Sequence, residues 1–183
     1  MAQSPKSFTT ISLVGILNVL KNQCGISQAF DPAAGGLAPP ATQFDAIWDT
    51  GATNSCVTQT VVDACGLTPI GVAEVHGVQG STFEDVFLVN IYLPNNVAFG
   101  GVRVTKAKLT GAEILIGMDV INQGDFAVTN MNGRTKFSFR VPSMQEIDFV
   151  AAQNPKLTQK LTHGGGKRSR KRRKGPGGKG RRK

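Results

Sequence analysis

The residues best suited to chemistry in this chain lie in the segment 44–55, where an apolar run ends in Asp49-Thr50-Gly51. The run at 46–48 predicts a strand that enters a hydrophobic core, and the glycine predicts a tight turn after it. A carboxylate at the end of a buried strand costs free energy unless it is hydrogen-bonded or shares a proton. Asp49 is therefore a candidate for catalysis, although the same three residue types also form ordinary turns.

The composition indicates one folded domain with a separate basic tail. The chain has 183 residues, of which 40% are hydrophobic, and its 22 glycines and 9 prolines favour β structure over a helical bundle. Of its 21 Lys and Arg, 11 lie in residues 167–183, which contain no acid. Residues 1–166 thus carry 10 basic against 12 acidic side chains, so the net charge of +9 belongs to the tail.

The cysteines indicate a reducing compartment. Cys24, Cys56 and Cys65 are an odd number without a Cys-x-x-Cys pair, which argues against a disulfide scaffold. We therefore expect a cytoplasmic protein, with a nuclear or particle-associated location as the alternative because of the basic tail. Cys and His are too few and too scattered for a zinc site, so no metal is predicted.

The hydrophobic pattern around Asp49 predicts mostly β elements. The run 113–120, interrupted by Gly117, predicts a buried strand and then a short helix near 118–123. An apolar stretch at 8–20 is too short to span a bilayer and predicts a strand that packs in the core or in a dimer interface. The other expected elements are a loop at 25–40, a short helix at 56–65, a hairpin at 74–89, strands at 90–93 and 102–109, and a closing hairpin of 126–128 with 135–141 that turns at Asn132-Gly133.

Three features in this order resemble the retropepsin-like aspartic proteases. The catalytic motif of that family is similar to the run Trp48-Asp49-Thr50-Gly51-Ala52. Its second signature, in which two apolar residues and a glycine precede a short helix, is similar to the run Ile114-Leu115-Ile116-Gly117. Between these two runs lies the glycine-bearing hairpin, at the place where the family has its flap.

The resemblance covers about residues 41–142 and is closer to the cellular and retrotransposon-type members than to the viral ones. The viral members usually carry an acid at the position of Thr53. The resemblance implies a mostly β fold, namely a closed retropepsin-like barrel with a flap hairpin and one short C-terminal helix. It also implies a structural role for Ile116 and Gly117, with the glycine letting its strand pack closely behind the Asp49 turn.

The chemistry that the resemblance implies is peptide hydrolysis by two facing carboxylates that share one proton, an arrangement for which aspartic proteases are the standard example. The ionised carboxylate activates a water, and the protonated one donates to the scissile carbonyl. Because the chain contains one Asp-Thr-Gly, the second carboxylate must come from a second copy, so we expect a homodimer with one Asp49 from each chain and no cofactor.

The resemblance also assigns supporting roles around the aspartate. Thr50 would hold the two turns together across the dimer axis, Gly51 would present its carbonyl to substrate, and Ala52 completes the motif. The flap residues Gly77, Val78, Gln79 and Gly80 would close over an extended peptide or protein substrate.

The chain thus divides into four expected parts. Residues 1–40 form an N-terminal interface strand and loop, which could be a removable pro-segment, and residues 41–142 form the protease domain. Residues 143–162 form a helix and linker, and residues 163–183 a disordered basic tail. The tail is suited to polyanions, with nucleic acid the leading partner and an anionic membrane or acidic protein as others. The alternative function is accordingly an inactive or latent protease-fold protein that holds nucleic acid or another polyanion through the tail.

Overall fold

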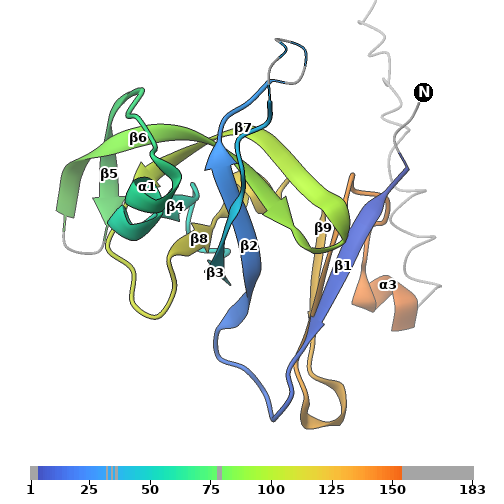
Figure 1. Cartoon of the computed structure of the whole chain (residues 1–183). Helices are drawn as coiled ribbons and strands as arrows, with labels where there is room; N and C mark the ends of the chain where they lie inside the picture. Colours follow the sequence, from blue (N-terminus) through green and yellow to red (C-terminus); the bar gives the residue numbers. More distant parts are fainter. Residues whose placement is uncertain (1–3, 32, 34, 36, 78–79, 154–183) are drawn as a thin grey trace, which may run out of the picture. The chain divides into compact units, whose positions relative to one another are not determined.

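Six β-strands close into a barrel in the computed structural model, which describes residues 4–31, 33, 35, 37–77 and 80–153 (Figure 1). Each strand pairs with the next, and β2 pairs with β6, so that the ring closes. β5 (Gly71–Gly77) lies outside the ring and forms a hairpin with β6. The predicted mostly β, closed barrel is confirmed. In ring order its strands are β2 (Leu20–Gln28), β3 (Thr42–Trp48), β8 (Ile114–Ile116), β4 (Cys56–Val57), β7 (Val97–Lys106) and β6 (Gly80–Leu93).

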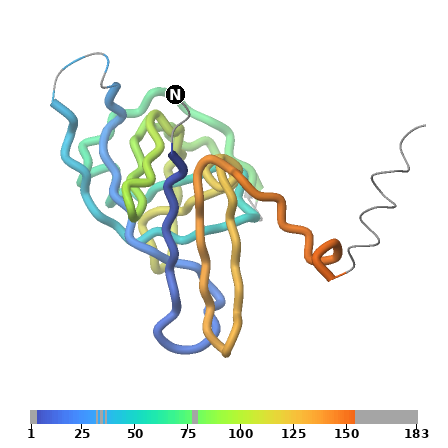
Figure 2. The backbone as a smooth tube through the Cα atoms, turned by 90° about the vertical axis from the view of Figure 1, so that its right-hand side faces the viewer, coloured from blue at the N-terminus to red at the C-terminus, as the bar shows by residue number. Residues whose placement is uncertain are grey.

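A separate three-stranded sheet packs against the barrel through aromatic rings. Its strand order is β1 (Lys6–Ile11), β10 (Lys136–Val141) and β9 (Asp125–Thr129), and Figure 2 shows β1 running beside the β9–β10 hairpin. The indole of Trp48 stacks on Phe126 with ring centroids 5.3 Å apart. It also contacts the rings of Phe8, Phe137 and Phe139. The sheet is thus anchored at the residue that precedes Asp49.

The short helices lie near their predicted positions, but the helix expected at 56–65 begins at Gln59, because Cys56 and Val57 form strand β4, which pairs with β7 and β8. α1 (Gln59–Cys65) buries Val61 and Val62 and ends at Gly66, whose φ of 58° is left-handed, as is common at a helix C-terminus. α2 (Met118–Ile121) follows Gly117 directly. A short 3₁₀ turn, η3 (Met131–Gly133), connects β9 to β10, and another, η2 (Pro94–Asn96), connects β6 to β7. α3 (Phe149–Gln153) belongs to a second unit that begins at Glu146.

The N-terminal elements differ from the predicted ones. The strand expected at 8–20 ends at Ile11, and a loop then runs to β2. β2 continues to Gln28, into the segment predicted as a loop, because Cys24 and Ile26 are completely buried and the strand pairs with β3 on one side and β6 on the other. The local glycine signal at Gly25 is overridden by this tertiary pairing.

Candidate active site

Asp49 occupies a hydrogen-bonded turn at the end of β3. β3 runs parallel to β8, with Trp48 opposite Ile116, and the Asp49 N–H donates to the Ile116 carbonyl at 3.0 Å. The Asp49 carboxylate accepts the Gly51 N–H at 2.8 Å. Ala46 and Trp48 of β3 are buried, but Asp49 is exposed. The carboxylate therefore avoids the desolvation free energy that its position after a buried strand suggests. It is free to meet a substrate or a second carboxylate.

The segment after Asp49 is held against β8 and α2 by backbone hydrogen bonds. The Met118 N–H donates to the Ala52 carbonyl at 2.8 Å, and the Asp119 N–H donates to the Thr53 carbonyl at 3.1 Å. Gly117 lies so close to this segment that a Cβ at its position would be 2.6 Å from the carbonyl carbon of Asn54. Only glycine fits without a backbone shift, which gives the apolar-apolar-glycine run its physical meaning.

Ser55 and Asp119 form a buried link behind the turn that sequence reasoning missed. Ser55 is fully buried, and its hydroxyl donates to the Asp119 carboxylate at 2.8 Å while accepting the Gly117 N–H at 3.0 Å. The same carboxylate accepts the N–H groups of Ser55 and Val120, each at 3.0 Å. The Asp119 carboxylate, in the first turn of α2, therefore fixes the segment that follows Asp49. The one available signal is a hydroxyl residue six positions after the aspartate.

A cavity of about 470 Å³ lies between the Asp49 turn and strand β5, a volume typical of ligand sites. Its walls are mostly apolar, with Glu74 and His76 as its charged or titratable side chains from β5. His76, expected at the surface, is exposed and also lines this cavity. The lining residues are Gly51, Ala52, Thr53, Asn54, Cys56, Ala73, Glu74, Val75, His76, Thr105, Ala107 and Leu115.

The predicted flap lies at the end of the β5–β6 hairpin. Gly77 pairs with Gly80, and four residues of β5 that lead to this end line the cavity. Val78 and Gln79 fall outside the described residues, as does the basic tail. Thr50 and Gly51 are exposed beside Asp49, and Ala52 is half-buried. The structure thus brings the aspartate turn and the β5–β6 hairpin to opposite sides of one cavity.

The charges around the cavity leave Cys56 as a neutral thiol. Burial raises the pKa of the Cys56 thiol to about 11, and the nearby carboxylates of Asp119 and Asp49 add to this effect. A neutral thiol is a poor nucleophile, so Cys56 is not suited to attack a carbonyl carbon. Among the described residues, no group of three or more His, Cys, Asp or Glu side chains is placed to hold a metal ion.

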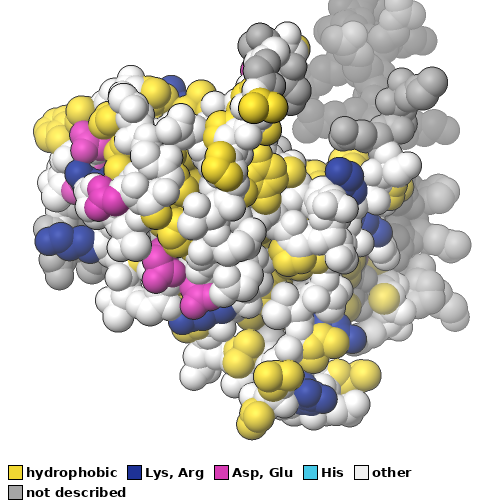
Figure 3. All heavy atoms as spheres, viewed as in Figure 1, with side chains coloured by type: hydrophobic (Ala, Val, Ile, Leu, Met, Phe, Trp, Pro, Cys, Tyr) yellow, Lys and Arg dark blue, Asp and Glu magenta, His cyan; other side chains and the backbone are white. Residues whose placement is uncertain are grey.

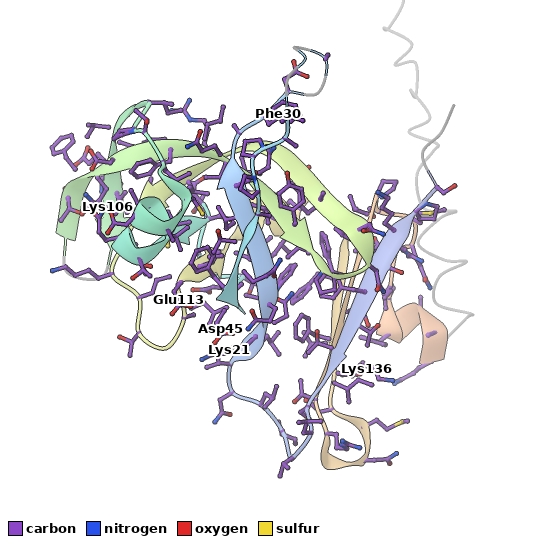
Figure 4. The ribbon with its side chains drawn as sticks, viewed as in Figure 1. Lys21, Phe30, Asp45, Lys106, Glu113 and Lys136 are labelled. Carbon is purple, nitrogen blue, oxygen red and sulfur yellow. The ribbon has the colours of Figure 1, made fainter. Side chains whose placement is uncertain are left out.

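Other acids lie near the turn but make local contacts. Asp45 on β3 is exposed, and its N–H donates to the Glu113 carboxylate at 3.2 Å, with Lys21 on the adjacent β2 (Figure 4). Lys106 forms an ion pair of 2.8 Å with Asp85, which raises the pKa of the lysine. Asp85 thus has a cationic partner in Lys106.

The fold was compared with known structures and families. A retropepsin-like aspartic protease from Rickettsia conorii aligns with a TM-score of 0.44 and 10% identity, over 77% of this chain and 98% of that chain. The EIAV protease in complex with the inhibitor HBY-793 aligns with a TM-score of 0.43 and 16% identity, over 57% and 86% of the two chains. The protease of simian foamy virus aligns with a TM-score of 0.38 and 18% identity, over 56% and 92%.

These three alignments are likenesses of the backbone at 10–18% sequence identity, with TM-scores of 0.38 to 0.44. No family model matches the sequence, and no curated protein is significantly similar to it. Within the part of the chain that the structure describes, no helix is both long and apolar enough to cross a bilayer.

Proposed function

We propose that this chain is an aspartic endopeptidase that acts as a homodimer, with one Asp49 carboxylate from each copy. The observation that carries the proposal is an exposed carboxylate, held at a hydrogen-bonded turn beside a cavity of peptide-binding size. The six-stranded barrel supplies the rigid support that such a group needs, because the turn is bonded to β8 and α2 through backbone and buried side chains.

The reaction needs two carboxylates and one shared proton. The ionised Asp49 removes a proton from a water, and the oxygen of that water attacks the scissile carbonyl carbon. The protonated Asp49 of the second copy donates its proton to the carbonyl oxygen, giving a tetrahedral gem-diol intermediate. The first Asp49, now protonated, gives that proton to the leaving nitrogen while the second Asp49, now ionised, takes a proton from a hydroxyl of the gem-diol. The carbon–nitrogen bond then breaks and leaves a carboxylic acid and an amine.

The substrate we propose is an extended peptide that lies between the Asp49 turn and β5. β5 is the last strand in its sheet, and it has one paired edge, toward β6. An extended peptide matches such an edge and places its side chains alternately on the two sides. The apolar lining of the cavity favours apolar side chains next to the cleaved bond.

The second carboxylate could instead come from the same chain, and Glu74 is the carboxylate among the described residues that line the cavity beside the Asp49 turn. This alternative is tested directly by Glu74→Gln. In the homodimer mechanism Glu74→Gln keeps most of the activity, whereas Asp49→Asn loses it.

The experiment is the cleavage of a denatured protein mixture between pH 4 and pH 7 at two enzyme concentrations. We expect Asp49→Asn to lower activity by at least about 10³-fold, since it removes the reacting carboxylate, with the free energy of unfolding unchanged within about 0.5 kcal/mol. We also expect the specific activity of the wild type to fall on dilution. A folded wild type that cleaves nothing, or an Asp49→Asn variant that still cleaves, would contradict the proposal.

A second function is favoured by the charge of residues 167–183, which carry 11 basic side chains and no acid. We propose that this segment binds nucleic acid through phosphate contacts. Binding of a mixed-sequence RNA should weaken steeply with salt, and a chain that ends at residue 166 should lose it. If the shortened chain binds equally well, the tail has no such role.

A further inference from the structure

The loop between β1 and β2 and the turn between β9 and β10 together form an exposed apolar tip, defined here as Leu13, Val14, Ile16 and Met131. Figures 1 and 2 both show the two connections side by side. In Figure 3 hydrophobic side chains gather at this end of the molecule. Leu13 is 89% exposed, Val14 86% and Met131 78%. Adjacent apolar residues exposed to this degree indicate a contact surface rather than scattered surface positions.

Hydrogen bonds hold this tip in one conformation. Thr135 is buried, and its hydroxyl accepts the Leu17 N–H and donates to the Asn130 side chain, at 2.8 and 2.7 Å. Ser12 is also buried, and its hydroxyl accepts the Thr135 N–H at 2.9 Å and donates to the Gly15 carbonyl. The loop therefore cannot turn its apolar side chains inward without breaking bonds to buried groups.

The Arg134 side chain adds to this support from the β10 side of the tip. Its guanidinium donates to the carbonyls of Ser12 and Leu13, at 3.2 and 3.1 Å. The cation is thus directed into the loop rather than away from it. A groove of about 490 Å³, lined by Ile11, Met131 and Arg134 among others, runs beside the tip. Ile11 and Met131 are its apolar lining residues and Arg134 and Lys136 its basic ones, so the exposed apolar tip borders a recess of mixed character.

The tip is continuous with the end of the barrel that carries Asp49. The loop leads directly into β2, whose first residue, Leu20, pairs with Trp48 in β3. Trp48 precedes Asp49 in the chain. Val19, the last residue of the loop, is 50% exposed and extends the apolar surface toward the aspartate.

We propose that the apolar tip is a contact surface for a second copy of this chain. The inference rests on the proposed function, because a single chain supplies one Asp49 and its site is incomplete without another. A copy that brings its own aspartate to this turn covers the neighbouring surface, and homodimer interfaces are enriched in apolar side chains at their centre. A stable interface buries about 800 Å² on each partner, to which several exposed aliphatic side chains contribute substantially.

An anionic membrane is the competing partner. Residues 4–24 and 126–145 contain lysines and arginines but no acid, which suits such a surface. A membrane accounts for the apolar and basic composition of the tip but not for its continuity with an incomplete catalytic site. A second copy accounts for the exposed apolar side chains and also completes the catalytic site, so we favour it and include the membrane as an outcome of the test.

The test is sedimentation velocity on the full chain over a wide concentration range, in an Asp49→Asn background so that no self-cleavage intervenes. Val14→Asp should raise the dimer dissociation constant at least about 100-fold, because it places a charge in an apolar contact. Met131→Asp, on the other connection, should do the same. The matched control is Leu37→Asp, which makes the same kind of change at a 96% exposed position between β2 and β3 and should alter the constant by less than about 3-fold.

The outcomes separate this inference from the proposed function. A wild-type dimer that persists in both tip variants overturns the inference and leaves a dimeric protease intact. A wild type that stays monomeric overturns the inference, and if it is nevertheless active, it overturns the two-copy mechanism as well. Binding of a monomeric wild type to phosphatidylserine vesicles, lost in Val14→Asp, assigns the tip to a membrane instead. If Val14→Asp weakens the dimer, but the dimer that retains Asp49 cleaves no protein, the result supports the interface and contradicts the proposed protease activity.

Discussion

The Asp49 turn and the apolar tip are built by the same device and present opposite chemistry. Each is a connection between strands that is held by a buried hydroxyl, Ser55 in the turn and Thr135 in the tip. Each hydroxyl accepts one backbone N–H and donates to one side chain, Asp119 for Ser55 and Asn130 for Thr135. The first arrangement holds a carboxylate in solvent, and the second holds aliphatic side chains there.

Hydrogen bonds to buried hydroxyls can thus fix the position of an exposed side chain, whether its own solvation favours exposure, as for Asp49, or opposes it, as for Leu13 and Val14. In the turn they orient a charged group that water would otherwise let move freely. In the tip they prevent Leu13 and Val14 from collapsing onto the barrel. A chemical site and a contact surface thus have the same structural basis, and the exposed side chain alone distinguishes their roles.

The largest effect on the turn should come from Gly117→Ala. A Cβ there would be 2.6 Å from a backbone carbon of Asn54, so the segment after Asp49 must shift. We expect the free energy of unfolding, measured by chemical denaturation, to fall by about 2–4 kcal/mol. We also expect the activity to fall at least about 10-fold, because the catalytic group is displaced. Gly71→Ala is the control, since a Cβ there meets no atom within 4 Å. Equal stability of the two variants would show that the close packing does not matter.

A paired substitution should separate the two hydroxyls. Ser55→Ala and Thr135→Val each remove one buried hydroxyl, and each should lower the free energy of unfolding by about 1–3 kcal/mol. Ser55→Ala should also lower kcat about 10-fold with little change in KM, because it loosens the support of Asp49. Thr135→Val should leave kcat unchanged for the assembled enzyme and instead weaken dimerisation. If both variants change kcat equally, the two hydroxyls act on global stability alone, and Ser55 has no separate role in supporting Asp49.

The smallest expected effect is a change in the free energy of unfolding at high pH, and it arises from Cys56 beside the Asp49 turn. Burial and two carboxylates raise the pKa of Cys56 to about 11 from an ordinary value of 9.0. The folded state therefore holds this proton more tightly than the unfolded state, so its contribution is complete below about pH 9 and is lost as the pH rises toward 11. Burial raises the pKa of Cys24 to about 12, in the same direction.

The measurement is the free energy of unfolding between pH 8 and pH 11 for the wild type and Cys56→Ala. The variant should show a shallower loss of stability, by up to about 2 kcal/mol over this range. Thr135→Val, in the tip, should follow the wild-type slope because residues 11–19 and 128–136 contain no cysteine. A Cys56→Ala slope equal to that of the wild type would exclude this thiol as the source.

Local sequence signals were sufficient for the parts of the site that are local. The apolar run before Asp49 predicted β3 and its turn, and the run around Gly117 predicted β8 and α2. The glycine-bearing hairpin was expected where β5 and β6 lie. Each of these depends on residues that are close in sequence, so periodicity and turn chemistry locate them.

Contacts between distant residues were not predictable in this way. Ser55 and Asp119 are 64 positions apart, and Ser12 and Thr135 are 123 apart. The strand expected at 8–20 stops at Ile11 because hydrogen bonds to Thr135 fold the chain into a loop. The sequence around Ser12, Ser55 or Thr135 does not distinguish a buried, hydrogen-bonded hydroxyl from an ordinary surface hydroxyl.

The sequence by itself determined that this chain carries one acid in an Asp-Thr-Gly turn, one glycine-bearing hairpin and a basic segment confined to its end. These are properties of residue type and order. Only the tertiary structure decided that β2 closes the ring against β6, that Ser55 and Thr135 are buried, and that Leu13 and Val14 remain in solvent. Burial is set by which distant strands pack together, and that choice is made by the whole chain rather than by any one segment of it.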